Sequence, residues 1–234
     1  MEIREIVTQV RSAIDELMVN DSDFLRESND EANLTRVIVD KIGYALQHLL
    51  EVAPLEKLDS SVFAMLPDTY VAANFSIDPN LVGRLRLPTD CLRIIEARLS
   101  TWSHFPVPED ASSPVYLMQQ DEYARGSWDR PVNILTYVNY YQQNKLITGK
   151  VLEMYSAQTE QDKLRFVYVA TPDFDAIRSY DPETKPQGTV EVPTALEKAL
   201  IYQTAGLAMV AFREDIAASL FTIADNYLNQ GLKT

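Results

Sequence analysis

The sequence predicts an α+β protein in which helices from both ends of the chain form a bundle and a β-rich segment is inserted between them. Near both ends, apolar residues recur at three- and four-residue steps, the spacing of one helix face. Between about residues 60 and 171, β-branched and aromatic residues gather in short runs and prolines are frequent. With 46% apolar and 24% charged residues over 234 positions, the chain can build a substantial core.

The N-terminal part predicts two helices joined by a polar connection. The first covers about residues 2–19, where one apolar stripe runs from Ile3 to Leu17. The second begins near Asn29 or Asp30, with acidic residues in its first turn, and Pro54 ends it. We therefore expect an antiparallel helical hairpin.

The middle part predicts short strands. The runs that indicate them are SSVFAML, RLRLP, RIIEARLSTW, VNILTYVNYY, KVLEMYSA and LRFVYVA. A short helix is expected near 114–125, after Pro114 and before Gly126. The strands should form a small sheet or a sandwich.

The C-terminal part predicts a long polar loop followed by two helices. The loop, Asp173–Glu191, is rich in Pro, Asp and Lys. We expect either this loop or the C-terminal end, Asn226–Thr234, to order on a partner. A helix apolar nearly all round follows from Thr194 to about Arg213, and a last helix ends before Gly231. The predicted domains are a bundle of 1–58 and 192–230, a β-rich insertion of 59–191 and a tail of 231–234.

Charge and cysteine content exclude several classes of protein. There are 34 acidic and 21 basic residues, a net charge of −13, so the chain lacks the cationic excess of a sequence-independent nucleic-acid binder. Cys91 is the only cysteine, which rules out an intramolecular disulfide and a cysteine-based zinc site. The N-terminus has no long apolar run, and the stretch Ala199–Phe212 is shorter than the ~20 residues a bilayer requires. We expect a soluble protein made in a cytoplasm.

Side chains capable of catalysis occur without a telling pattern. The sequence contains no GxGxxG, GxxxxGK[ST], HExxH or GxSxG motif. His48 lies beside an apolar helix stripe, and His104 follows Trp102 in a proline-bounded loop. Acidic pairs, which we interpret as solvated loop residues, occur at Asp21/Asp23, Asp121/Glu122 and Asp173/Asp175. We predict no catalytic residue, no metal site and no cofactor.

Two groups of side chains suggest partner surfaces. One local basic concentration suits either an acidic partner or the solvated side of edge strands; its members are Arg84, Arg86, Arg93 and Arg98. The last helix presents an apolar face that includes Tyr227 and Leu228. Tyrosines are frequent in the middle part, as in sugar-binding surfaces, protein interfaces and strand cores.

Several short strings, in this order, resemble the head-to-tail adaptor proteins of short-tailed bacteriophages, including ring proteins of crAss-like phages. They are LPTDCLR at 87–93, Trp102, SPVY at 113–116 with Gln119, YARGS at 123–127 and RPV at 130–132. The resemblance in layout covers about residues 1–230 and is sharpest over roughly 85–135. The Asp173–Glu191 loop and the acidic segment after Asn20 do not match it.

This resemblance implies a structural virion protein without enzymatic activity. Such subunits assemble into a twelve-fold ring beneath the portal protein, contact further ring or tail hub proteins, and extend the channel through which duplex DNA passes. The expected location is the virion neck, after assembly in the host cytoplasm, with no membrane partner. Two alternatives stay open. One is a carbohydrate- or receptor-binding module of a phage tail, and the other is an enzyme that uses His104 or a carboxylate pair.

Overall fold

A computed structural model describes residues 1–17, 28–121, 123–142, 145–181, 184 and 188–230. The chain is α+β, with helices at its ends and two β-sheets in its middle. It divides into two compact units, a helical unit of 1–62 with 171–234 and a β unit of 63–170. The expected α+β class is confirmed.

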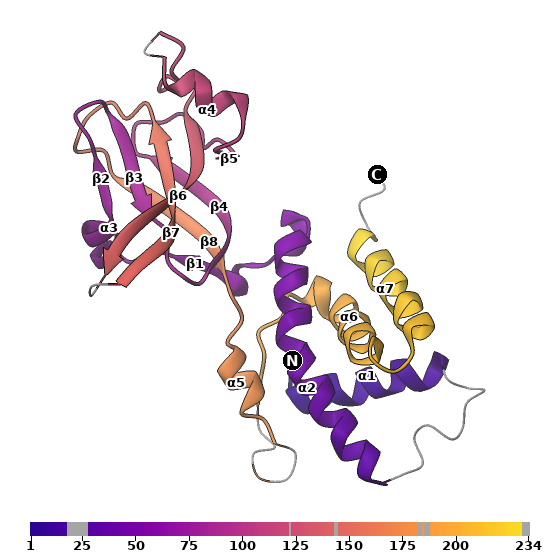
Figure 1. Cartoon of the computed structure of the whole chain (residues 1–234). Coiled ribbons are helices and arrows are strands. Elements are labelled where there is room, and N and C mark those ends of the chain that lie inside the picture. Colours follow the sequence, from indigo (N-terminus) through magenta and orange to yellow (C-terminus); the bar gives the residue numbers. More distant parts are fainter. Residues whose placement is uncertain (18–27, 122, 143–144, 182–183, 185–187, 231–234) are drawn as a thin grey trace. The chain divides into compact units, whose positions relative to one another are not determined.

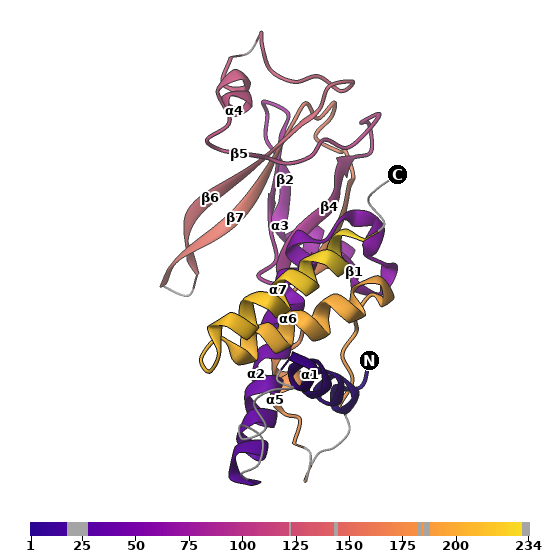
Figure 2. The same ribbon diagram turned by 90° about the vertical axis from the view of Figure 1, so that its right-hand side faces the viewer.

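The helical unit is built around a helix that is buried on most sides. Its helices and short 3₁₀ turns are α1 (Ile3–Leu17), α2 (Ser28–Val52), η1 (Leu55–Lys57), η2 (Ser60–Val62), α5 (Phe174–Arg178), η3 (Thr194–Leu196), α6 (Glu197–Met209) and α7 (Glu214–Asn229). Helix α6 packs against α7, α2 and α1, and even its Thr204 is fully buried. Figure 2 shows α6 and α7 lying side by side. The all-round apolar sequence of α6 predicted this central position.

The β unit contains two sheets. The three-stranded sheet has the order β1 (Phe63–Met65), β8 (Leu164–Ala170), β4 (Cys91–Leu99). The five-stranded sheet has the order β2 (Phe75–Ile77), β3 (Val82–Arg86), β7 (Lys145–Tyr155), β6 (Val132–Gln142), β5 (Glu109–Asp110). All pairings are antiparallel except β5 with β6. Figure 1 shows β6 and β7 as the longest strands.

One hydrophobic core joins the two sheets of the β unit. Leu85 and Leu152 of the five-stranded sheet share a cluster with Leu99 and Phe166 of the three-stranded sheet, and all four are almost completely buried. Buried Asn133 on β6 adds a polar link, because its Nδ2 donates a hydrogen bond of 2.9 Å to the Ala97 carbonyl on β4. The insertion is therefore a sandwich, one of the two forms that the sequence predicts.

The boundary of the insertion differs from the predicted residues 59–191. Residues 171–191 belong to the helical unit, where the Ile3 amide donates to the Gly188 carbonyl at 2.9 Å and Glu2 bridges Thr189. Asp173 caps α5 by accepting hydrogen bonds from the amides of Asp175 and Ala176. This segment also buries Ile177, Tyr180 and Val190. It thus contributes apolar side chains that its polar composition conceals, although residues 182–183 and 185–187 lie outside the described residues.

The short helix predicted near 114–125 is shorter in the structure. Helix α4 (Pro114–Gln119) begins at the cap Ser113, whose hydroxyl accepts a hydrogen bond from the Val115 amide. The chain then turns back, because the Gln119 side chain accepts a hydrogen bond from the Gly126 amide at 2.9 Å. The sequence did not predict the short elements α3 (Asp68–Asn74), β2, β5 and α5.

Candidate functional surface

The four arginines predicted as a partner surface lie on strands of two different sheets. Arg84 and Arg86 point outward from β3, in the five-stranded sheet. Arg93 and Arg98 are half-buried on β4, in the three-stranded sheet. Closeness in sequence therefore does not make them one group, and each pair has its own surroundings.

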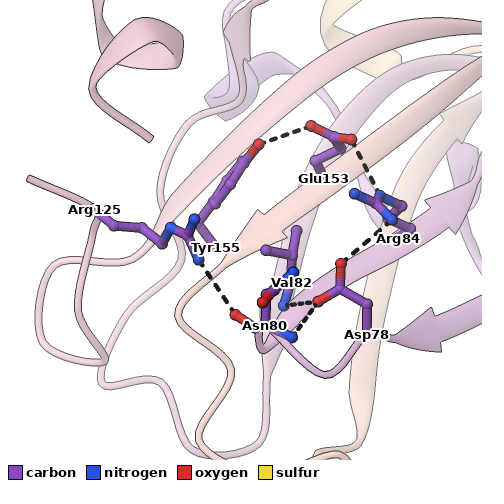
Figure 3. Close-up of polar contacts among 7 residues, drawn as sticks. All are labelled: Asp78, Asn80, Val82, Arg84, Arg125, Glu153 and Tyr155. Atoms are coloured by element: carbon purple, nitrogen blue, oxygen red, sulfur yellow. Dashed lines mark hydrogen bonds and ion pairs between the residues drawn. The ribbon is translucent and has the colours of Figure 1, made fainter. Parts of the chain in front are cut away.

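The charge of Arg84 is engaged within the β unit, as Figure 3 shows. Its guanidinium pairs with Asp78 at 3.3 Å and with Glu153 at 3.2 Å. The Tyr155 hydroxyl donates to the other Glu153 oxygen at 2.9 Å. Burial, together with that bond to a carboxylate, raises the pKa of the Tyr155 hydroxyl well above its usual value. Arg84 thus binds strand β7 to the turn that precedes β3.

That turn is held by Asp78, which makes this cluster structural. Its Oδ1 accepts hydrogen bonds from the amides of Asn80 at 2.9 Å and Val82 at 3.0 Å. Leu81 adopts a left-handed φ of 59°, which a leucine tolerates only where the surrounding contacts hold it. Arg125 donates to the Asn80 carbonyl from the opposite loop at 3.4 Å (Figure 3). These groups satisfy one another and leave Arg84 little capacity for a partner.

Arg98 has a different environment, an open hollow at one end of the β4–β8 pair. Arg98 lies directly across from Arg165 of β8. The Glu96 carboxylate pairs with Arg98 at 2.9 Å and with Arg165 at 3.2 Å. The hollow has a volume of about 280 Å³, and its lining consists of Arg98, Leu99, Ser100, Lys163, Leu164 and Arg165. We call these six residues the basic hollow.

The basic hollow has more positive charge than its carboxylate can neutralise. Like charges directly opposite on paired strands destabilise a sheet, so Glu96 offsets a repulsion between Arg98 and Arg165. Lys163 adds a third cation on the exposed surface, and no carboxylate of the described residues lies within ion-pair distance of it. Three cations against one carboxylate, beside the partly exposed Leu164, suit an acidic ligand that also carries an apolar side chain.

Hydrogen bonds hold the loop residues beside the basic hollow in place. Asp162 is buried and accepts hydrogen bonds from the Thr101 hydroxyl at 2.7 Å and the Gln158 amide at 2.8 Å. Burial would by itself raise the pKa of this carboxyl, but its hydrogen bonds outweigh that effect and lower the pKa. The Ser100 amide donates to the Lys163 carbonyl at 2.9 Å. The loop that presents Lys163 is therefore fixed at both sides.

The two residues predicted on the last helix are occupied within the helical unit. Leu228 is buried in its core. The Tyr227 ring stacks on Tyr202, with centroids 5.5 Å apart, and Lys198 lies over it. Lys57 donates to the Tyr227 carbonyl at 2.9 Å. Leu228 is therefore closed to an external partner, and Tyr227 is only half-exposed.

The residues that the sequence suggested for catalysis belong to different elements of the two units. His104 is exposed, and its Nδ1 lies 3.0 Å from the hydroxyl of the neighbouring Ser103. His48 is an exposed residue on α2. Of the acidic pairs, Asp121 and Asp173 fold back on nearby amides, whereas Asp21, Asp23 and Glu122 lie outside the described residues. Within the part of the chain that the structure describes, no three His, Cys, Asp or Glu side chains form a group able to hold a metal ion.

Cys91 is buried at the start of β4. Burial, against a smaller opposing effect of Lys150, raises the pKa of its thiol to about 12. A thiol of this kind stays protonated at neutral pH and is a poor nucleophile. Cys91 is therefore a small apolar core residue.

A second exposed surface is aromatic and lies on the long segment between β5 and β6. Tyr123 is 97% exposed and Trp128 is 51% exposed. Leu117 and Met118 of α4 are also exposed. Single exposed apolar residues are common, but four within one loop region indicate a contact surface.

The sequence matches no known protein-family model, and no curated protein matches it. None of the helices that the structure describes is both long enough and apolar enough to cross a membrane.

Proposed function

We propose that this protein is a structural subunit of the ring that joins the DNA-filled head of a short-tailed bacteriophage to its tail. The observation that carries the proposal is the basic hollow, a contact surface with surplus positive charge on a chain whose net charge is −13. The family resemblance supplies the identity of the ring. The β sandwich inserted between terminal helices agrees with the layout that this resemblance implies.

A ring requires two different, mutually complementary surfaces on every subunit, because each subunit contacts its neighbours head to tail. The distribution of charge suits such a pairing. The helical unit carries 22 acidic and 11 basic residues, so −11 of the net charge lies there, whereas the β unit carries 12 and 10. The β unit is nearly neutral as a whole, but its basic hollow contrasts with the acidic helical unit, and such a contrast favours directed association over random aggregation.

The net negative charge of the chain suits a channel that duplex DNA must traverse quickly. Each wall cation that paired with a phosphate would add a salt-dependent hold, and a ring of about twelve copies, as the resemblance implies, would multiply it. We propose that the acidic helical unit repels DNA while Arg98 and Arg165 of the basic hollow serve protein contacts. The portal protein above and a further ring or tail hub protein below are the proposed neighbours.

The test is the oligomeric state of the purified chain, measured by mass photometry alone and with portal rings of the same virus. We expect closed rings of uniform size, or one ring of subunits on each portal. We also expect no binding of duplex DNA at micromolar protein and moderate salt. A chain that stays monomeric under all these conditions, or that binds duplex DNA tightly, would contradict the proposal.

A carbohydrate- or receptor-binding module of a phage tail is the second candidate, and the exposed Tyr123 and Trp128 favour it. Aromatic rings of this kind can stack on sugar faces and resemble interface residues in equal measure. A glycan array distinguishes the two functions. Binding that is lost in Tyr123→Ala and Trp128→Ala but kept in Tyr137→Ala, an exposed tyrosine of β6, would favour the lectin.

A further inference from the structure

The basic hollow and a ridge on the helical unit have complementary chemistry. The ridge is the segment Glu51–Glu56, at the end of α2 and the start of η1. Its Val52 and Leu55 are each 48% exposed, and exposed glutamates stand at both ends. It therefore presents two apolar side chains between two carboxylates.

The ridge is held rigidly, so presenting it to a partner costs little conformational entropy. Ala53 is fully buried, and its amide donates to the Leu49 carbonyl at 2.8 Å. Pro54 fixes the backbone before η1, and the Leu58 amide closes that turn on the Leu55 carbonyl at 3.1 Å. Lys57, the residue after the ridge, is itself anchored to α7, because its ammonium group donates a hydrogen bond to the Tyr227 carbonyl.

The hollow has the opposite charge, because Arg98, Lys163 and Arg165 lie around the partly exposed Leu164. Leu99 also lines the hollow but is buried in the core of the β unit, so Leu164 is its apolar side chain open to a partner. Glu96 neutralises one of the three cations, which leaves a formal surplus of two, equal to the two carboxylates of the ridge. Apolar contact at the centre and opposite charges at the rim are the usual composition of a specific interface.

We propose that the basic hollow of one copy binds the Glu51–Glu56 ridge of a second copy, and that this contact links neighbouring subunits. The inference rests on the proposed ring function and names the contact that builds the ring. The pairing is head to tail, since the hollow belongs to the β unit and the ridge to the helical unit. Such a contact leaves one unused hollow and one unused ridge until a ring closes.

A second copy explains the hollow better than a nucleic-acid phosphate does. The partly exposed Leu164 has no counterpart on a phosphate group, whereas Val52 and Leu55 are apolar side chains that can contact it. The net charge of −13 also disfavours the approach of DNA. Binding of DNA at the hollow is therefore an outcome that the experiment must distinguish.

Charge reversal on each side tests the contact. One variant, here called the hollow variant, carries Lys163→Glu and Arg165→Glu, and the other, the ridge variant, carries Glu51→Lys and Glu56→Lys. Each alone brings like charges together and should weaken self-association on the order of a hundredfold, measured by sedimentation velocity and mass photometry. Mixing the two restores opposite charges at every contact and should restore assembly.

Matched controls carry the same charge changes elsewhere in each unit. Arg130→Glu with Lys150→Glu serves the β unit, and Glu5→Lys with Asp225→Lys serves the helical unit; all four residues are exposed. Both controls should assemble like the wild type. Circular dichroism and tryptophan fluorescence confirm that every variant is folded.

A crosslink covers the case in which the wild-type contact is too weak to detect without a portal. With cysteines at Val52 and Lys163, a short bismaleimide should give a ladder of covalent multimers, and Cys91 is buried and does not compete. Absence of the ladder together with unaltered assembly of both reversed variants would overturn this contact. It would leave the ring function standing, because wild-type assembly and the absence of duplex DNA binding test that function separately. Loss of DNA binding in the hollow variant, without loss of self-association, would also overturn it.

Discussion

Replacement of Asn133 by aspartate should make the stability of the β unit depend on pH. Asn133 is fully buried on β6, and its Nδ2 donates to the carbonyl of Ala97 at 2.9 Å and to that of Pro106 at 3.3 Å. Asn133→Asp keeps the shape but, once ionised, sets a carboxylate oxygen against two carbonyl oxygens. A protonated carboxyl can still donate to one of them, so the defect belongs to the charged form.

The expected magnitude follows from burial. A fully buried carboxyl has its pKa raised by up to roughly 3–5 units above about 3.9, and each unit corresponds to about 1.4 kcal/mol. Because the folded-state pKa is raised, the variant is close to the wild type below the unfolded pKa, and its deficit grows as the pH rises towards the folded pKa. We expect a deficit growing by about 1.4 kcal/mol per pH unit and reaching roughly 4 kcal/mol near neutral pH.

Urea unfolding followed by tryptophan fluorescence measures this deficit, because both tryptophans, Trp102 and Trp128, lie in the β unit. The series runs from about pH 5.5 to 7.5, above the isoelectric point of about 4.6. Asn139→Asp, at an exposed position of the same strand, is the control and should change stability little at any pH. A flat difference between Asn133→Asp and the wild type across this range would refute the assignment of Asn133 as a buried donor between the sheets.

Three further outcomes are expected. Cys91 should react with a thiol reagent far more slowly in the native chain than in urea, because its pKa is raised to about 12; equal rates would contradict its burial. Asp162→Ala should lower the free energy of unfolding by roughly 1–3 kcal/mol at neutral pH, because it leaves Thr101 and the Gln158 amide without their acceptor. Since the folded-state pKa of Asp162 is lowered, this difference should shrink as the pH falls through the carboxyl range, and a pH-independent difference would point to packing alone. Gly43→Ala should loosen α5 from α2, because a Cβ there would lie 2.7 Å from the Phe174 ring; trypsin cleavage after Arg178 should accelerate while helical circular dichroism stays unchanged.

Periodicity predicted the elements whose apolar residues repeat over several turns. Helix α1 buries Ile3, Ile6, Val10 and Ile14 on one face, as its spacing indicates. The segment 171–191 shows why the boundary of the insertion was missed. Its buried Ile177, Tyr180 and Val190 are too few to show a period over several turns, so its polar composition made it resemble a solvent-exposed loop. Helix α3 has only seven residues, too few for a periodic signal.

The candidate surface was predictable only in part, because strand register decides which charges meet. The sequence singled out Arg98, but its neighbour Arg165 comes from a strand paired across two register shifts, near Cys91 and Ile94. Those shifts cannot be read from alternation, since each extra residue moves the following side chains to the other face. The charge of Arg84, which the sequence also singled out, is instead neutralised by Glu153, a residue 69 positions further along the chain.

Electron microscopy of the neck of intact particles tests the central claim most directly. We expect a closed ring beneath the portal, with one β sandwich and one helical unit in each repeat and with the Glu51–Glu56 ridge of each subunit in the basic hollow of the next. Arg98, in the basic hollow, should lie at a protein contact, and Arg84, Arg86 and Arg93 should lie away from the channel. A neck without this chain, or a ring whose Arg84, Arg86, Arg93 and Arg98 line the channel against DNA, would contradict the assignment.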